Sequence, residues 1–372
     1  MKKYPVMFKL NTNGKTINQW QICVDGDRFF TIEGLQNGAL TTSKPTICKG
    51  KNIGRANETT DAEQAISEAE SKIQKKKDKG YTEDITKVST CKTTFSPMLA
   101  FTYEDYIGKV QFPVLCSRKI DGLRYVAQAS GGFTRNGKPY VSVTHIQQML
   151  APVFEAHPEW IIDGEIYSED VPFEEVVSLV KKQKPDAAEL AESEVKCKLY
   201  LFDGVIDDVN AGFETRFDAI RKEIIRLVGN TKYIVWVKNE VANSHDELIE
   251  LHDKYVAEGW EGIMLRKMGS PYENKRSKNL MKHKNFKDAE YKIVDIVEGI
   301  GSRAGMAGKL VVLLEDGTTC ESGIRGNEAY YTTLLKNRKK LIGKKATIRY
   351  QGFTEAGKLR FPVATAIDPI DR

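Results

Sequence analysis

The sequence lacks the features that mark several classes of protein. Its six cysteines are scattered over 372 residues without a C-x-x-C pair, which argues against a disulfide framework or a structural zinc site and for a reducing compartment. No apolar run approaches the roughly 20 residues that cross a bilayer, and the N-terminus has no signal-peptide stretch. No internal repeat or low-complexity tract occurs. These absences predict a soluble cytoplasmic protein with no membrane partner, and the length suits two or three domains.

The net charge of +5 is small, but the charges are segregated. Residues 1–95 carry a net +5, residues 96–265 a net −10 and residues 288–372 a net +3. Residues 266–287 hold eight Lys or Arg side chains against one Glu. An acidic body with basic flanks suggests metal or acid–base chemistry in the middle and a polyanion held at several places. A solvated charged face is an equal alternative for the 266–287 cluster taken alone.

The first 82 residues predict a small basic α+β domain. Short alternating stretches separated by Gly-Asp and Asn-Gly indicate an antiparallel sheet. A capping box at Thr60–Glu63 then opens a helix, whose core-facing positions are expected to be Ala62, Ile66, Ala69 and Ile73. Residues 83–95, rich in Thr, Lys and Ser, are expected to be a linker.

Residues 96–287 read as a mixed domain of strands and helices. Strands are expected at 113–117, 123–128, 161–166, 198–206, 233–237 and 262–266. Helices are expected at 145–154, 172–184, 214–228 and 244–258, the last with a capping box at Ser244–Glu247. Residues 288–372 carry five short strands and one helix (328–341), which suits a small barrel of the OB type.

The segment Lys119-Ile120-Asp121-Gly122-Leu123-Arg124 is the densest chemical signal. Its acid-glycine turn would place an amine and a guanidinium beside one anionic ligand. A lysine nucleophile must be neutral, so we expect neighbouring cations and partial burial to lower its pKa from about 10.4. Taken alone, the hexapeptide could also be a surface β-turn.

An ordered set of companions accompanies this segment. They are Thr134-Arg135-Asn136-Gly137, Asp163-Gly164-Glu165, Leu199-Tyr200-Leu201-Phe202-Asp203, Glu261-Gly262-Ile263-Met264-Leu265-Arg266 and Leu280-Met281-Lys282-His283-Lys284. Weaker companions are Ser96-Pro97-Met98-Leu99-Ala100, Glu214-Thr215-Arg216, Lys275-Arg276-Ser277 and Arg360-Phe361-Pro362-Val363. The whole set resembles the covalent nucleotidyltransferases, and among them the ATP-dependent DNA ligases of the bacteriophage type, over roughly residues 92–372.

The resemblance implies a role for each matched residue. Lys119 would be the residue that becomes adenylylated. Glu165 would bind the ribose, Phe202 would lie against the adenine, and Glu261 and Glu165 would be metal ligands. The other nucleotide-binding residues would be Arg124, Arg135, Arg266, Arg276, Lys282 and Lys284. For Phe202 ordinary core packing is the alternative, and His283 is expected to be packed or outward-facing.

The resemblance also implies a fold and a function. The expected fold is α+β: a catalytic domain of antiparallel sheets with helices (96–287), similar to ATP-grasp, followed by an OB barrel (288–372). The expected activity is sealing of 5′-phosphate/3′-hydroxyl nicks in double-stranded DNA by a monomer that uses ATP and Mg²⁺, with Mn²⁺ as a substitute, in a bacterial or phage-infected cytoplasm. An RNA ligase, a capping nucleotidyltransferase and a non-catalytic nucleic-acid-binding protein remain alternatives.

Two further features qualify this interpretation. The last motif of phage and viral ligases opens with an arginine, whereas this sequence has Asp368. Either Arg372, Lys358 or Arg360 substitutes, or the enzyme carries out its self-adenylylation step differently. Gln19-Trp20-Gln21-Ile22 and Asn52-Ile53-Gly54-Arg55 make residues 1–82 similar to a WGR module, which implies duplex binding through phosphates. A basic domain that only packs on the catalytic core is the alternative.

Overall fold

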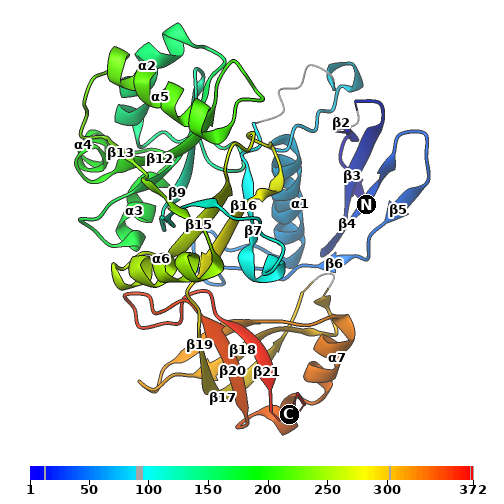
Figure 1. Cartoon of the computed structure of the whole chain (residues 1–372). Coiled ribbons are helices and arrows are strands. Elements are labelled where there is room, and N and C mark those ends of the chain that lie inside the picture. The colour runs from blue at the N-terminus through cyan, green and yellow to red at the C-terminus, as the bar shows by residue number, and fades with distance from the viewer. Residues whose placement is uncertain (12–13, 89–94, 301–302, 369, 372) are drawn as a thin grey trace. The chain divides into compact units, whose positions relative to one another are not determined.

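The structure is a computed structural model that describes residues 1–372 except 12–13, 89–94, 301–302, 369 and 372 (Figure 1). Contacts divide the chain into two compact units. One unit is residues 94–285, and the other combines residues 1–93 with residues 286–372. The three domains and the linker expected from the sequence stay a prediction.

The N-terminal part is an antiparallel sheet with one helix. The strands are β1 (Lys2–Lys3), β2 (Met7–Leu10), β3 (Ile17–Asp25), β4 (Arg28–Leu35), β5 (Leu40–Thr42) and β6 (Thr46–Ile47). Helix α1 (Asp61–Lys77) buries Ala65 and Ala69 against Trp20 and Ile22 of β3. A short 3₁₀ turn, η1 (Ile85–Lys87), follows.

The start of α1 agrees with the sequence, but its buried face is shifted. The Thr60 side chain accepts a hydrogen bond from the Glu63 amide, and the Glu63 carboxylate accepts one from the Thr60 amide, so the capping box is confirmed. The prediction that Ala62 faces the core is wrong: Ala62 is exposed and Ala65 is buried. Ala62 lies in the first turn of α1, ahead of the first buried positions, Gln64 and Ala65.

Two five-stranded sheets build the 94–285 unit. Their strands are β7 (Leu99–Thr102), β8 (Val114–Arg118), β9 (Leu123–Gln128), β10 (Gly131–Phe133), β11 (Ile161–Tyr167), β12 (Lys198–Val205), β13 (Ile234–Trp236), β14 (Asn239–Ala242), β15 (Gly262–Lys267) and β16 (Arg276–Lys284). The sheet orders are β10-β9-β11-β12-β13 and β14-β8-β15-β16-β7. The six predicted strands are present, and β7, β10, β14 and β16 were not predicted.

Helices cover the outer faces of both sheets (Figure 1). They are α2 (Thr144–Ala156), α3 (Phe173–Val180), α4 (Ala187–Lys196), α5 (Phe213–Leu227) and α6 (His245–Ala257), with a 3₁₀ turn η2 (Tyr103–Tyr106). Helices α2, α3 and α5 share the core of the first sheet, and α6 packs on β14, β8 and β15.

Two helix predictions in this unit need correction. The helix expected over 172–184 ends at Val180, and a second helix, α4, starts after its own N-cap, Asp186. The capping box expected at Ser244–Glu247 is half formed. Ser244 accepts from the Glu247 amide, but the Glu247 carboxylate turns to the amide of Asn243 at 2.8 Å.

The C-terminal part is a closed barrel in the order β17-β18-β19-β21-β20. Its elements are β17 (Lys287–Glu298), β18 (Ala307–Leu313), β19 (Thr319–Ile324), α7 (Glu328–Lys336), α8 (Arg338–Leu341), β20 (Lys345–Tyr350) and β21 (Val363–Ile367). The single helix expected over 328–341 is interrupted at Asn337. The last strand begins after Phe361, whose φ of 52° is incompatible with an extended strand. The α+β class with a barrel after the catalytic domain is confirmed.

Two expectations about the whole chain can be compared with the described residues. The five cysteines in the described ranges are buried and unbridged, while Cys91 lies outside them. Among the described helices, none has the length and apolar character needed to cross a bilayer.

Candidate active site

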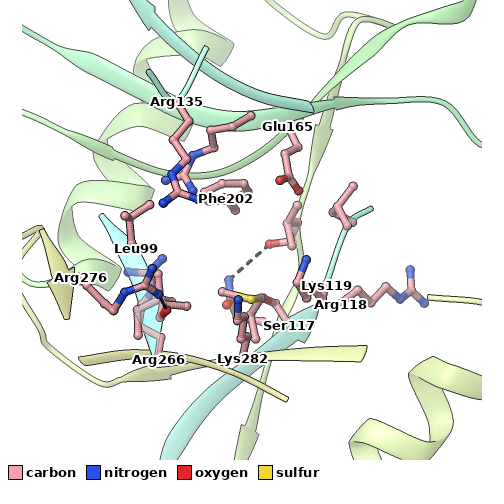
Figure 2. A pocket seen from close by; sticks show the side chains of 17 residues that line it. Leu99, Ser117, Arg118, Lys119, Arg135, Glu165, Phe202, Arg266, Arg276 and Lys282 are labelled. Atoms are coloured by element: carbon pink, nitrogen blue, oxygen red, sulfur yellow. Dashed lines mark hydrogen bonds between the residues drawn. The ribbon is translucent and has the colours of Figure 1, made fainter. Parts of the chain in front are cut away.

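A pocket of about 200 Å³ lies between the two sheets of the 94–285 unit. Figure 2 shows side chains from both sheets pointing into it. Eight of the ten predicted site residues line it: Lys119, Arg124, Arg135, Glu165, Phe202, Arg266, Arg276 and Lys282. The other two, Glu261 and Lys284, are joined to Lys119 by a chain of hydrogen bonds.

Lys119 follows directly after β8 and is fixed by the neighbouring strand. Its backbone amide donates to the Gly262 carbonyl at 2.9 Å. Its Nζ donates to one oxygen of Glu261, and Nζ of Lys284 donates to the other oxygen. The side chains of Lys119, Glu261 and Lys284 are 16%, 7% and 18% exposed. One carboxylate thus holds two largely buried ammonium groups.

The expected lowering of the Lys119 pKa is wrong for this structure. Burial does favour the neutral amine, but the attraction of the Glu165 and Glu261 carboxylates outweighs burial, and the pKa of Lys119 is raised above 10.5. The sequence placed cations near Lys119, whereas its immediate neighbours in space are acids. In this state Lys119 is a stabilised ammonium ion.

The two glutamates beside Lys119 differ in their protonation. Burial raises the pKa of Glu165 to about 7, against the opposing pull of Lys119 and Arg124. Burial also opposes ionisation of Glu261, but Lys119 and Lys284 outweigh it and hold the pKa of Glu261 below its usual value. Glu261 is therefore the permanent anion, and Glu165 changes charge near neutral pH.

Two glycines allow these strands to approach one another. A Cβ on Gly122 would lie 2.5 Å from the Ile166 carbonyl oxygen, so a side chain there would push the Lys119 turn away from Glu165. Gly262 has φ of +147°, and a Cβ on it would lie 2.3 Å from the His283 carbonyl oxygen. The close approach brings Glu261 within reach of Lys284 across the β15–β16 pair.

Several basic side chains line the pocket on different sides. Burial and the charges of Lys284 and Lys119 lower the pKa of Lys282. In the described part of the chain, the side chains of Lys282 and Arg135 make no hydrogen bond or ion pair. Arg276 donates to the Ala100 carbonyl. Cations crowded around a hollow without matching acids are a ready site for an anion such as a phosphate.

Phe202 lies in the upper part of the pocket in Figure 2, and Arg124 also lines the pocket. Phe202 is half-buried, so its ring is open to a ligand as well as packed on the core. The Arg124 guanidinium lies 4.9 Å from the Phe202 ring centroid. Arg124 is itself tied to the Asp163 carboxylate and donates to the Met98 carbonyl at 3.1 Å.

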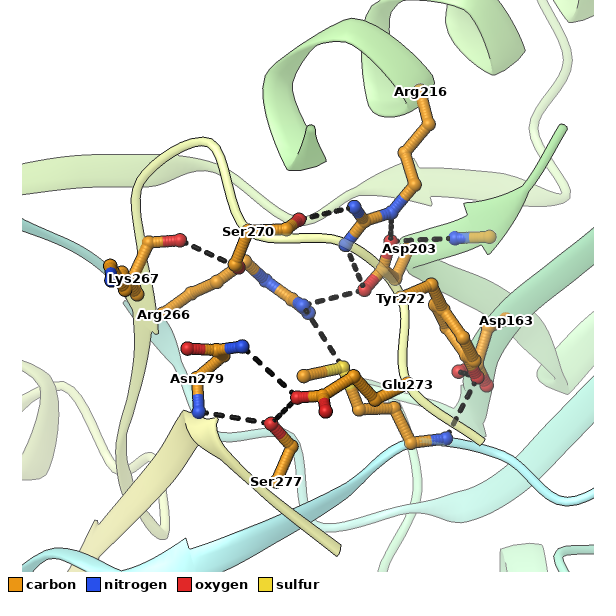
Figure 3. Close-up of polar contacts among 12 residues, drawn as sticks. Asp163, Asp203, Arg216, Arg266, Lys267, Ser270, Tyr272, Glu273, Ser277 and Asn279 are labelled. Atoms are coloured by element: carbon orange, nitrogen blue, oxygen red, sulfur yellow. Dashed lines mark hydrogen bonds and ion pairs between the residues drawn. The ribbon is translucent and has the colours of Figure 1, made fainter. Parts of the chain in front are cut away.

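Two buried aspartates bind arginines of this pocket (Figure 3). Asp163 accepts from Arg124 and, at 2.5 Å, from the Tyr272 hydroxyl. Asp203 accepts from Arg216 at 2.6 Å and pairs with Arg266 at 2.7 Å. Arg124 and Arg266 line the pocket, yet their charges are already matched by these aspartates.

Sequence reasoning missed several residues of this site. Ser117, Arg118, Asn239 and Met264 also line the pocket. Tyr272 was missed because its link to Asp163 spans 109 residues. Successive side chains of a strand point to opposite faces, so predicting strands β14, β15 and β16 could have identified the positions that face the pocket.

The remaining site expectations have different outcomes. His283 packs in a cluster, with Nδ1 2.7 Å from Glu104 Oε1 and its ring centroid 4.2 Å from that of His252. Of the proposed substitutes for the missing arginine, Lys358 Nζ donates to the Thr318 hydroxyl and Arg360 lies over the Phe361 ring. Arg372 lies outside the described residues.

Comparison with known proteins agrees with this geometry. Residues 97–284, just over half of the chain, match the model of the ATP-dependent DNA ligase domain. The chain belongs to the ATP-dependent DNA ligase family. The DNA ligase of Enterobacteria phage T6 is 28% identical over 72% of this chain and 67% of that protein. The DNA ligase of Haemophilus influenzae is 27% identical over 66% of this chain and 83% of that protein.

The fold itself also occurs among solved structures. A structure solved in a study of Lig E DNA ligases superposes with a TM-score of 0.61, at 24% identity, over 73% of this chain and 98% of that chain. Family membership confirms the predicted enzyme class, a ligase that uses ATP and forms phosphodiester bonds. An RNA ligase, a capping enzyme and a non-catalytic binding protein are not favoured.

Proposed function

We propose that this ligase seals nicks in duplex DNA through a lysyl-AMP intermediate on Lys119. The neutral Nζ of Lys119 attacks the α-phosphorus of ATP; the new N–P bond replaces the bond to pyrophosphate, and the amine gives up a proton. The 5′-phosphate at the nick then displaces Lys119 and takes the AMP. Finally the 3′-hydroxyl attacks the activated phosphate, AMP leaves, and a phosphodiester bond closes the strand.

The pocket supplies a partner for each part of ATP. Phe202 offers a ring face to the adenine. Glu165 is placed to accept from the ribose hydroxyls. Lys282, Arg135 and Arg276 would hold the phosphates. Phosphoryl-type transfer depends on positioning and charge neutralisation more than on covalent help, and this wall of cations supplies both.

Arg124 and Arg266 act differently in this proposal. Both guanidiniums are bound to buried carboxylates, so they would shape the pocket rather than carry the phosphate charge, and Arg124 would also orient Phe202. Through these pairs Asp163 links β11 to β9, and Asp203 links β12 to β15.

A divalent cation fits the donor chemistry of the pocket. The described residues hold no cluster of three or more acidic, His or Cys ligands, but Mg²⁺ in nucleotide sites commonly takes one or two carboxylates and completes its shell with phosphate oxygens and water. Glu261 and Glu165 would supply these carboxylates, and Mn²⁺ would be accepted as well. When bound, the cation would neutralise phosphate charge. Engaging the two carboxylates would also remove the attraction that holds Lys119 protonated.

The single observation that carries the proposal is Lys119 held by Glu261 at the edge of a cation-walled pocket. The test is incubation with ATP labelled at the α-phosphate and Mg²⁺, followed by denaturing electrophoresis. We expect an acid-labile adduct on the parent enzyme and on Lys222→Ala, which changes an exposed lysine of α5, and no adduct on Lys119→Ala. An adduct that survives Lys119→Ala overturns the assignment, and sealing with NAD⁺ alone overturns the choice of ATP.

The finer features of the substrate belong to the same proposal. The enzyme acts as a monomer on nicked double-stranded DNA in a bacterial or phage-infected cytoplasm, and residues 1–82 bind the duplex through phosphates. Arg360 or Lys358 takes over from the arginine that Asp368 replaces. Assays on nicked DNA–DNA, DNA–RNA and RNA–RNA duplexes test the substrate.

A further inference from the structure

A second pocket, of about 270 Å³, lies on the reverse face of the sheet that carries Lys119. Successive side chains of a strand point to opposite faces. Met264 and Lys282 are partners across β15 and β16 and line the first pocket. Their neighbours Leu265 and Met281 are also partners, and they line the second pocket. Residues of the basic segment 266–287 therefore line two separate pockets, one on each face of the sheet.

The second pocket has a basic rim over an apolar floor. Its rim carries Lys109, Lys267 and Lys278, all exposed, and its floor includes the buried Leu265 and Met281. None of the described residues that line it is an Asp or a Glu. The absence of acids is informative because residues 96–265 hold 28 acidic against 18 basic side chains.

The three rim lysines differ in their pairing from Lys196 and Lys254 of the same unit. Lys196 pairs with Glu175 and Glu192, and Lys254 pairs with Glu240. Within the described ranges, Lys109 and Lys267 have no side-chain ion pair or hydrogen bond, and Lys278 Nζ lies 5.2 Å from the Tyr106 ring centroid. Three unmatched charges converging on one hollow repel one another, and an anion bound there would relieve this repulsion.

We propose that this second pocket binds phosphate groups of the duplex backbone away from the nick. The inference rests on the proposed function. Lysine ammonium groups bind phosphate as point charges, and cations at an open rim can reach an extended polyanion. A site built for a free anion would instead enclose it with buried donors, and the one buried polar side chain among the described lining residues, Arg266, is already paired with Asp203. Contacts between DNA and this pocket would increase the affinity of the enzyme for the duplex without involving the reacting atoms.

The test compares two triple variants of the full chain. Lys109→Ala, Lys267→Ala and Lys278→Ala are combined in one, and Lys181→Ala, Lys184→Ala and Lys222→Ala, exposed lysines elsewhere in the unit, in the other. Binding to an intact duplex without ATP is measured from 50 to 200 mM salt. Each lost phosphate contact reduces the slope of log K against log salt by about 0.9, so the pocket variant should lose about 2–3 from the slope while its AMP adduct is unchanged. A slope equal to that of the control triple overturns the proposal.

A second measurement uses the parent enzyme and carries no risk of misfolding. Duplex DNA should protect Lys109, Lys267 and Lys278 from acetylation, read by mass spectrometry, while Lys222 stays reactive. Equal acetylation with and without duplex overturns the proposal. Protection by inorganic pyrophosphate but not by duplex would assign the pocket to free anions and also overturn it. If no lysyl-AMP adduct forms on Lys119, the proposed function is wrong. The acetylation experiment does not depend on that adduct, so the two proposals can fail separately.

Discussion

Nζ of Lys119 donates a hydrogen bond to the Glu261 carboxylate, so the proposed nucleophile is bound to an acid in the structure. The pair joins residues 142 positions apart and is largely buried. It stabilises the ammonium form, which cannot attack ATP. Binding of ligand must therefore weaken this pair before Lys119 can react.

The reactivity of Lys119 should respond to removal of the Glu261 charge. Glu261 favours the ammonium form, so Glu261→Gln should lower the pKa of Lys119 and raise the fraction of free amine at pH 8. Each unit of lowering gives about tenfold more neutral amine. The measurement is the rate of labelling of Lys119 by an amine-reactive reagent, without ATP or metal, located by peptide mapping.

A nearby carboxylate provides the control for this experiment. Glu258 pairs with Arg118 at 2.7 Å rather than with Lys119. Glu258→Gln should leave the labelling rate of Lys119 close to that of the parent. Slower or unchanged labelling in Glu261→Gln would show that Glu261 does not control the ammonium.

Glu165 should make the unliganded fold less stable as the pH rises through neutrality. Its folded pKa of about 7 lies above its ordinary value of 4.5, so the folded state holds more protons between these values. Stability that is present below pH 4.5 is then lost progressively up to about pH 7. The loss amounts to roughly 3 kcal/mol at most.

The check is thermal unfolding of the parent and Glu165→Gln at pH 5, 6, 7 and 8 without ATP or metal. The amide of Glu165→Gln does not ionise. The melting temperature of this variant, measured relative to that of the parent, should therefore increase as the pH rises. Glu174→Gln, an exposed change on α3, should follow the parent at every pH. Parallel curves for Glu165→Gln and the parent would refute the titration of Glu165.

Contiguous motifs explain why so much of the site could be predicted. Lys119, Glu165 and Phe202 each sit at a strand or turn that the local pattern reveals, and the pocket unites them. The six predicted strands are apolar enough to stand out. By contrast, β16 has a markedly basic sequence, Arg276–Lys284, and reads as surface. Arg276 and Lys282 of this strand line the first pocket, and Lys278 lines the second.

What the sequence could not reveal are partners distant along the chain. The pKa of Lys119 depends on Glu165 and Glu261. A sequence motif does not show how close either carboxylate lies to Lys119. Arg266 belongs to a basic cluster in the sequence, yet in space its charge is matched by Asp203. An arginine in a basic stretch of sequence can therefore be either a phosphate ligand or a buried residue that is paired with an acid.

Arg216 should be essential for the stability of the 94–285 unit. Its side chain is 2% exposed, pairs with Asp203 and donates to the Ser270 carbonyl at 2.6 Å. Arg216→Ala leaves a buried carboxylate with fewer partners, which typically costs about 3–5 kcal/mol. Urea unfolding followed by fluorescence should show a lower midpoint.

The same helix supplies a control for Arg216. Arg226 of α5 is 60% exposed and pairs with Glu223. Exposed pairs contribute about 0–1 kcal/mol, so Arg226→Ala should unfold near the parent midpoint. Similar losses in the two variants would mean that removal of any charge from α5 is destabilising, and the buried network would not be responsible.

Lysines of α1 should contribute to duplex binding if residues 1–82 contact DNA. Lys72, Lys75 and Lys79 are exposed and spaced to share one side of the helix and its end. Combined replacement by alanine should weaken binding of an intact duplex at least tenfold at low salt, with less effect at high salt because the attraction is screened. Fluorescence anisotropy with labelled duplex measures both.

Paired lysines of the same domain test whether the position of charge matters. Lys49 and Lys51 are exposed but are bound to Asp61 and Glu68. Replacing both lysines by alanine leaves Asp61 and Glu68 without these partners. It lowers the net charge of the domain by two, as the replacement of any two lysines would. If α1 forms the contact, the Lys49/Lys51 variant should bind duplex several-fold more tightly than the α1 variant. Equal weakening per lysine removed would mean that total charge governs binding, and the basic domain would then have no DNA-facing surface on α1.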